Sequence, residues 1–175
     1  CTSLTDVTIP NSVTQMGSSV FLGCTSLENV SISNSITKLE RGLFYGCTSL
    51  TIVTIPSSVR EIDWEVFYGC TALTNVTIPS SVTSIGKSAF SGCTSLKSVV
   101  IPSGVTRIED FTFSKSGLTG VTIPSGVTEI GSYAFGDCTS LTSMTIPLSV
   151  TFIDSWAFMG CTGLTDIYYA GTKAQ

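Results

Sequence analysis

The sequence repeats itself about every 23 residues, and this period constrains the fold more than any other feature. The first unit reads CTSLTDVTIPNSVTQMGSSVFLG, and close copies of it follow along the whole chain. Seven units start at residues 1, 24, 47, 70, 93, 116 and 138, and a partial eighth starts at residue 161. The sixth unit is one residue short and carries Ser116 near the place of the usual cysteine. Residues 1–175 are therefore predicted to form a single repeat array, and we expect this array to be a piece of a longer protein.

When the units are stacked, each apolar position becomes a column. One column consists of leucines: Leu4, Leu27, Leu50, Leu73, Leu96, Leu118, Leu141 and Leu164. Another consists of phenylalanines: Phe21, Phe44, Phe67, Phe90, Phe113, Phe135 and Phe158. A single unit has too little surface to bury these side chains, whereas neighbours on both sides bury them continuously. The repeat therefore predicts a solenoid with one continuous core.

Each unit contains a short alternating segment, V-T-I, that is typical of a strand with an outward-facing threonine. In the first unit this segment is Val7–Ile9, and Pro10 ends it. The second half of the unit must return the chain along the outer face, through a second short strand and a short helical turn that ends near Gly23. A 23-residue period is too short for a strand followed by a crossover helix. The pattern thus disfavours a βαβ domain.

The complete pattern, L-x-x-V-x-I-P-x-x-V-x-x-I-G-x-x-A-F-x-x-C, resembles the BspA-like (Treponema-type) leucine-rich repeat over residues 1–169. The closing IYYAGTKAQ is also similar to the end of such arrays in gut bacteria. The resemblance implies a leucine-rich-repeat solenoid of the α/β horseshoe type, mostly β, with one short parallel strand per coil and short extended or helical segments on the outer face. Members are mostly secreted or surface proteins of mucosal bacteria and some parasitic protists, and several are adhesins. The resemblance therefore implies an extracellular or cell-surface location, but it supplies no binding motif.

The chain has seven cysteines, and each occupies the same place in its unit. A column of this kind favours small, buried, reduced thiols that act as weak S–H donors. Neighbouring coils would bring two Cα atoms to about 5 Å, so disulfide pairing stays sterically open. Metal binding needs converging ligands, but the chain has no histidine and a straight thiol column is not tetrahedral. We expect no metal and no cofactor.

Few residues are suited to catalysis. Without histidine the usual Ser-His and Cys-His bases are missing, and no Gly-rich phosphate loop is present. Glu40 and Asp63 hold equivalent places on adjacent coils, which makes them a candidate carboxylate pair for a glycan-active enzyme, the least favoured function. Lys38 and Glu61 are predicted to form an exposed ion pair between coils.

The net charge of −4 and the absence of a basic run argue against nucleic-acid binding. No segment is apolar enough for membrane insertion.

Ligand-binding candidates are the positions that the core does not use. On the outward strand face Thr54, Thr77 and Asn75 belong to a nearly uncharged hydroxyl surface. Such a surface suits protein or glycan binding, but threonine also suits any exposed strand.

Aromatic residues form a second group of candidates. Two positions before the core phenylalanine, three consecutive units carry Phe111, Tyr133 and Trp156, a ladder that could bind a partner or pack in an outer layer. Tyr45 and Tyr68 form a second pair one position after the core phenylalanine, and Trp64 lies nearby in the sequence. The same alternatives apply to these three residues.

The repeat, the missing catalytic residues and the resemblance favour a non-catalytic binding module of a cell-surface or secreted protein. Its expected partners are proteins or glycans on host or microbial surfaces. The alternative is an inert spacer that displays another domain. Because a solenoid exposes an apolar cross-section at each end, we also expect either flanking caps or end-to-end self-association.

Overall fold

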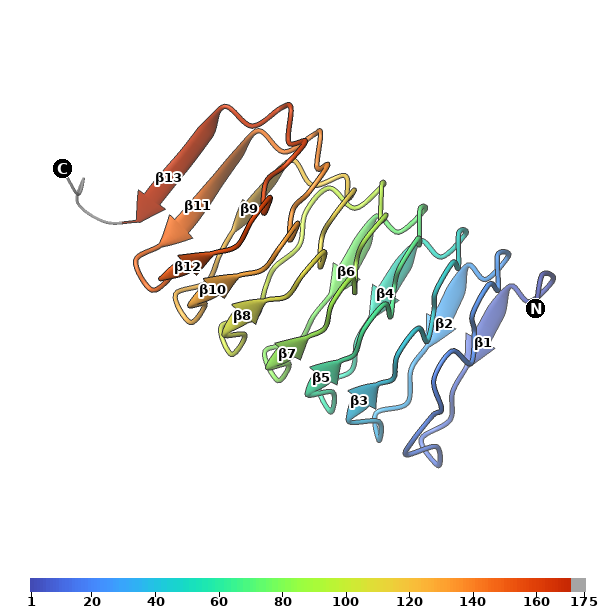
Figure 1. Ribbon diagram of the computed structural model, residues 1–175. Coiled ribbons are helices and arrows are strands. Elements are labelled where there is room, and N and C mark those ends of the chain that lie inside the picture. The colour runs from blue at the N-terminus through green and yellow to red at the C-terminus, as the bar shows by residue number, and fades with distance from the viewer. Residues whose placement is uncertain (171–175) are drawn as a thin grey trace.

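The computed structural model describes residues 1–170 and shows a solenoid of stacked coils (Figure 1). One face carries the first row of strands: β1 (Asp6–Thr8), β2 (Asn29–Ser31), β4 (Ile52–Thr54), β6 (Asn75–Thr77), β9 (Gly120–Thr122), β11 (Ser143–Pro147) and β13 (Asp166–Ala170). A second row follows at the next corner of each coil: β3 (Lys38–Leu39), β5 (Glu61–Ile62), β7 (Ser84–Ile85), β8 (Arg107–Ile108), β10 (Glu129–Ile130) and β12 (Phe152–Ile153). The closing residues 171–175 of the IYYAGTKAQ segment lie outside the described residues.

All strand pairs are parallel and join equivalent positions of neighbouring coils. Val7 pairs with Val30 in the first row, and Lys38 pairs with Glu61 in the second. The side chains alternate as predicted: Val53 is buried, while Ile52 and Thr54 on either side of it are exposed. The stacking predicted from the repeat is thus confirmed in its register.

The predicted leucine and phenylalanine columns form the core. The phenylalanine rings stack from coil to coil along the array, with ring centroids 5.2 Å apart at the closest step and 5.9 Å at the widest. Five of these rings are fully buried: Phe44, Phe67, Phe90, Phe113 and Phe135. A solenoid needs such a ladder because each coil is too small to enclose a core alone.

The third side of each coil differs from the sequence-based prediction. No helix occurs within residues 1–170, so the predicted helical turn before Gly23 is wrong. The chain instead makes overlapping turns, in which the Leu22 amide donates to the Ser19 carbonyl at 3.1 Å. The backbone of Ser19 and Gly23 is left-handed, with φ of 59° and 66°, and residues in this conformation interrupt an α-helix. We call this third side the turn face.

The cysteine column lies beside the phenylalanine ladder. All seven cysteines are free thiols, and five of them are buried. As predicted, the thiol acts as a donor: the Cys70 Sγ donates to the Phe44 carbonyl of the preceding coil at 3.2 Å. Equivalent bonds are donated by Cys47, Cys93, Cys138 and Cys161. Burial raises the pKa of the Cys93 thiol to about 12. Burial also raises the pKa of Cys70, so these two central thiols stay protonated and have a structural role.

The short sixth unit changes the stacking locally. Its amide at Gly117 donates to the Cys93 carbonyl at 3.1 Å, and a Cβ at Gly117 would lie 2.1 Å from the Thr94 carbonyl oxygen. Only glycine fits this approach without movement of the backbone. Residues 98–100 of the preceding coil form no strand, so the first row is interrupted between β6 and β9.

Candidate functional site

The candidate residues from the sequence fall on two different faces of the solenoid. Thr54, Asn75 and Thr77 lie on β4 and β6 and are exposed on the strand face. All six aromatic candidates lie on the turn face or at its border with the second row of strands: Tyr45, Trp64, Tyr68, Phe111, Tyr133 and Trp156. The sequence singled out both sets, but their positions on two separate faces follow only from the coil geometry.

Three of the aromatic residues form a stacked ladder. The rings of Phe111 and Tyr133 lie 5.0 Å apart with an interplanar angle of 7°, and Trp156 continues the stack 5.5 Å from Tyr133. Phe111 is 42% exposed and Trp156 is 62% exposed, so the chain does not cover this ladder as it covers the core phenylalanines. Exposed aromatic side chains in a row are typical of binding surfaces.

The backbone beneath this ladder is left-handed. The φ angles of Phe111, Tyr133 and Trp156 are 57°, 51° and 60°, and the equivalent residue of the second coil is Gly42. A bulky side chain in this conformation is rare and costs about 1–3 kcal/mol. Small or polar residues occupy the other coils at this position, namely Ser19, Glu65 and Ser88. The three aromatic residues thus carry a conformational cost at an exposed position, which is a pattern associated with function.

A hollow of about 460 Å³ lies between the aromatic ladder and the tyrosine pair. Tyr45 and Tyr68 stack with their ring centroids 4.6 Å apart. The hollow is lined by Tyr68, Ser88, Ser91, Phe111, Ser114, Lys115, Tyr133 and Asp137. It therefore joins the two groups of aromatic candidates into one surface, which we call the serine-floored hollow.

Trp64 lies next to a second, smaller hollow on the other side of Phe111. This hollow of about 370 Å³ is lined by Arg41, Trp64, Glu65, Lys87, Ser88, Asp110 and Phe111. The Arg41 guanidinium lies 6.0 Å from the Trp64 ring centroid and also pairs with Glu65 at 3.0 Å. Ser88 and Phe111 line both hollows, so Phe111 stands at the centre of the aromatic surface.

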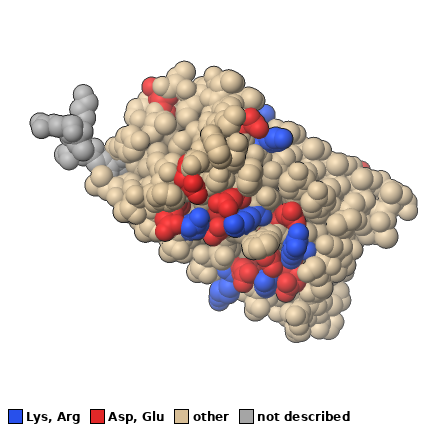
Figure 2. Space-filling model, viewed as in Figure 1, with Lys and Arg blue, Asp and Glu red and all other residues tan. Residues whose placement is uncertain are grey.

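Charged side chains gather in one band over the second row of strands and the turns that follow it (Figure 2). At one end Lys38 contacts Glu61 at 3.0 Å, as predicted, and also Asp63 at 2.8 Å and Glu40 at 3.8 Å. These carboxylates hold the pKa of Lys38 above its ordinary value. Glu40 and Asp63 therefore share one ammonium partner, and this contact gives the proposed catalytic pair an ion-pairing role.

The same band continues through Arg107, which pairs with Glu109 and Glu129. Lys87 contacts Asp110 at 2.7 Å and lowers the pKa of that carboxyl. Each Lys and Arg of these ion pairs has a carboxylate partner, and the carboxylates outnumber them, so the band carries a net negative charge.

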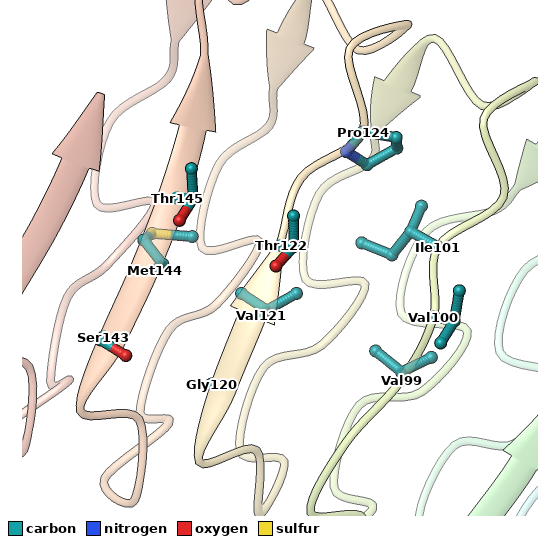
Figure 3. A pocket seen from close by; sticks show the side chains of 10 residues that line it. All are labelled: Val99, Val100, Ile101, Gly120, Val121, Thr122, Pro124, Ser143, Met144 and Thr145. Carbon is teal, nitrogen blue, oxygen red and sulfur yellow. The ribbon is translucent and has the colours of Figure 1, made fainter. Parts of the chain in front are cut away.

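The strand face also has a hollow that the sequence did not indicate (Figure 3). It encloses about 430 Å³ and is lined by Val99, Val100, Ile101, Gly120, Val121, Thr122, Pro124, Ser143, Met144 and Thr145. It arises where the first row of strands is interrupted and where Gly120 has no side chain. Val100, 80% exposed, replaces the usual threonine here.

Within residues 1–170 no group of three His, Cys, Asp or Glu side chains is placed to hold a metal ion. Nor does any helix in this range have the length and hydropathy needed to cross a membrane.

Comparison with known proteins identifies the type of repeat in this array. The model of the BspA type leucine-rich repeat region, in six copies, matches residues 1–114 and 60–174. A leucine-rich cell surface protein of Faecalibacterium prausnitzii A2-165 is 28% identical, with a TM-score of 0.56 over 99% of this chain and 62% of that chain. The leucine-rich repeat protein of T. pallidum is 29% identical, with a TM-score of 0.66 over 94% of this chain and 69% of that chain. No curated protein matches the chain.

The solved structures that resemble this chain are longer than it is. A leucine-rich repeat protein of Bacteroides ovatus is 27% identical, with a TM-score of 0.52 over 93% of this chain and 60% of that chain. The chain spans 62% of the Faecalibacterium protein, so the repeats here correspond to a part of such proteins.

Proposed function

Because the chain belongs to the BspA type leucine-rich repeat family, we propose that it is a non-catalytic binding module of a cell-surface or secreted protein. Its ligand is a protein or glycan on a host or microbial surface, and the turn face is the surface that binds it. A structural relative from Faecalibacterium is described as a cell surface protein, which supports the location.

The aromatic ladder is the observation that carries this proposal. Phe111, Tyr133 and Trp156 are stacked, with Phe111 and Trp156 exposed and Tyr133 half-buried between them. All three have a left-handed backbone that disfavours large side chains. A structural role does not require aromatic residues here, because Ser19 and Ser88 occupy the same position in other coils. A binding role explains why the conformational cost is carried on three consecutive coils.

The test compares two triple variants of the immobilised chain. The turn-face variant, Phe111→Ser, Tyr133→Ser and Trp156→Ser, copies the serine of other coils at each site. The strand-face control, Ile52→Thr, Val100→Thr and Tyr168→Thr, replaces three exposed apolar or aromatic side chains of the strand face with threonine. Both variants are first checked for the circular-dichroism spectrum of the parent. They are then exposed to a panel of extracellular-matrix proteins, mucosal glycans and microbial cells.

We expect a ligand that binds the parent and the strand-face control but loses at least tenfold in affinity for the turn-face variant. Binding that is lost only in the strand-face control would move the site to that face. If neither the parent nor the control binds any member of the panel, the binding proposal is rejected in favour of the inert spacer.

A further inference from the structure

The two aromatic stacks of the turn face end against the same gap. Tyr45 covers one ring face of Tyr68, and the next coil carries Ser91 at that position. Tyr133 covers one ring face of Phe111, and the preceding coil carries Ser88 at that position. Each stack therefore ends, on the side of the fourth coil, at a ring face without an aromatic neighbour. Tyr68 and Phe111 both line the serine-floored hollow that lies there.

This arrangement matters because a ring inside a stack, such as Tyr133, has an aromatic neighbour on both faces and presents only its edge, whereas a ring that ends a stack does not. In a stack that runs along the solenoid axis, the faces of the inner rings are covered by their neighbours. A ligand ring can stack only on a face that is left free, which is the case for Phe111 and Tyr68 above the fourth coil. Adjacent coils lie about 4.8 Å apart, so a ring inserted at the level of the fourth coil lies one coil spacing from Tyr68 on the third coil and from Phe111 on the fifth, which stand in different columns.

The polar groups around the gap narrow the chemistry of that ring. Its lining includes the hydroxyl-bearing residues Ser88, Ser91, Tyr68 and Tyr133, together with the carboxylate residue Asp137. Ser114 is already bonded, since its hydroxyl donates to the Gly136 carbonyl at 3.0 Å. The hollow therefore combines free aromatic faces with several unshared hydrogen-bonding groups.

We propose that the serine-floored hollow binds one pyranose ring of a glycan, inserted at the level of the fourth coil against the free faces of Phe111 and Tyr68. This inference rests on the proposed binding function and specifies its ligand class. A pyranose has an apolar C–H face for the aromatic ring and a hydroxyl edge for the serines, Asp137 and Lys115. The aromatic side chain of a protein ligand would fill the same gap but leave those polar groups without partners, which lowers affinity.

The charges at the hollow favour a neutral sugar. Lys115 and Asp137 are one cation and one anion on adjacent coils, and both are exposed. No single sign of charge therefore dominates the lining. Neutral hexoses and N-acetylhexosamines are the sugars that this lining fits best.

The experiment fills the gap with a ring that the protein itself supplies. Ser88 has a left-handed backbone with φ of 57°, like Phe111, Tyr133 and Trp156, which all accept large rings at this position. The variant Ser88→Tyr should extend the ladder by one ring and occupy the gap without loss of folding. The matched control is Ser19→Tyr, with φ of 59° at the same position of the first coil, away from the hollow.

The probes are methyl glycosides of neutral hexoses, N-acetylhexosamines and sialic acid, together with oligosaccharides of these sugars. Binding is followed by chemical-shift titration and by calorimetry with the complete chain of residues 1–175. We expect at least one neutral saccharide to bind the parent and Ser19→Tyr, and to lose at least tenfold in affinity for Ser88→Tyr. Ser88→Tyr should still unfold cooperatively, with a thermal midpoint somewhat below that of the parent because a large side chain is costly in the left-handed conformation.

The outcomes separate this inference from the proposed function. If no saccharide binds but a protein ligand does, and Ser88→Tyr weakens that protein ligand, the glycan inference is overturned and the turn-face proposal stands. If a saccharide binds the parent and Ser88→Tyr equally well, the hollow is not its site and the inference is overturned. Absence of any binding to the parent would overturn both.

Discussion

At the residue scale, backbone conformation distinguishes the aromatic residues of the turn-face ladder from those of the core. Phe113 belongs to the core ladder and is fully buried, whereas Phe111, two residues earlier, is left-handed and exposed. Both are phenylalanines in the same coil. Truncation of Phe113 should therefore cost packing energy, whereas truncation of Phe111 relieves backbone strain and removes little buried apolar surface.

This contrast predicts a large loss of stability for the core residue and a small change for the ladder residue. Phe113→Ala should lower the free energy of unfolding by about 3–5 kcal/mol, because it leaves a cavity in the core. Trp156→Gly should change it by less than about 1 kcal/mol, because glycine suits the left-handed backbone and the lost ring is 62% exposed. Urea denaturation of both variants measures the difference. A loss of several kcal/mol in Trp156→Gly would show that the ladder is structural and would count against the binding proposal.

The shortened sixth unit leads to a second prediction at this scale. In Gly117→Ala the new Cβ would lie 2.1 Å from the Thr94 carbonyl oxygen, so the backbone must shift. We expect a loss of about 1–3 kcal/mol in the free energy of unfolding. The control is Gly17→Ala, where a Cβ meets no atom within 4 Å and should have little effect. Equal stability of the two variants would contradict the tight approach of Gly117 to the preceding coil.

At the scale of the repeated element, the cysteine column couples folding to alkaline pH. Burial raises the pKa of Cys93 to about 12 and that of Cys70 well above its ordinary value, whereas an unfolded cysteine has a pKa of about 8.5. Above about pH 8.5 the unfolded chain therefore loses thiol protons that the folded chain retains. Ionisation favours the unfolded state, so the stability that these thiols contribute below pH 8.5 is lost as the pH rises toward 12.

We therefore expect the free energy of unfolding to fall between about pH 8.5 and 10, with each such thiol contributing up to about 1.4 kcal/mol per pH unit. Urea titrations in the presence of a reductant measure this slope. Cys93→Ala should make the slope shallower, whatever its effect on stability at neutral pH. Cys1→Ala, which removes an exposed thiol, should leave the slope of the parent unchanged. The same slope in all three proteins would refute the protective burial of Cys93.

At the scale of the whole molecule, the repeat was sufficient to predict the contacts between equivalent positions of neighbouring coils. The leucine and phenylalanine columns, the strand register and the Lys38–Glu61 pair follow from equivalent positions one unit apart, because stacking converts sequence spacing into contact. The left-handed backbone at the position of Ser19, Glu65 and Phe111 could not be predicted. Serine, glutamate and aromatic residues do not indicate this conformation, as a repeated glycine would. The hollows were missed as well. They depend on which small residues of one coil face large residues of the next, such as Ser88 beside Phe111.

The two ends of the array determine how the chain 1–175 behaves in solution. The first coil exposes Leu22 to 53%, and at the other end Phe152 is 52% exposed and Ile167 is 40% exposed. Within residues 1–170, β1 pairs only with β2 and β13 only with β11, so each terminal strand has an open edge. Open edges and apolar side chains favour the addition of another copy, and the two ends differ, so contact is head-to-tail and does not close.

We therefore predict a weight-average mass that rises with protein concentration in sedimentation equilibrium. Phe152→Lys with Ile167→Lys places two charges on one end and should lower the mass toward that of a monomer. The control, Ile52→Lys, adds a charge to the strand face away from both ends and should not reduce association. A monomeric mass of the parent at every concentration would rule out the end-to-end contact. An equal reduction by the control would locate self-association on the strand face instead, where it would compete with any ligand bound there.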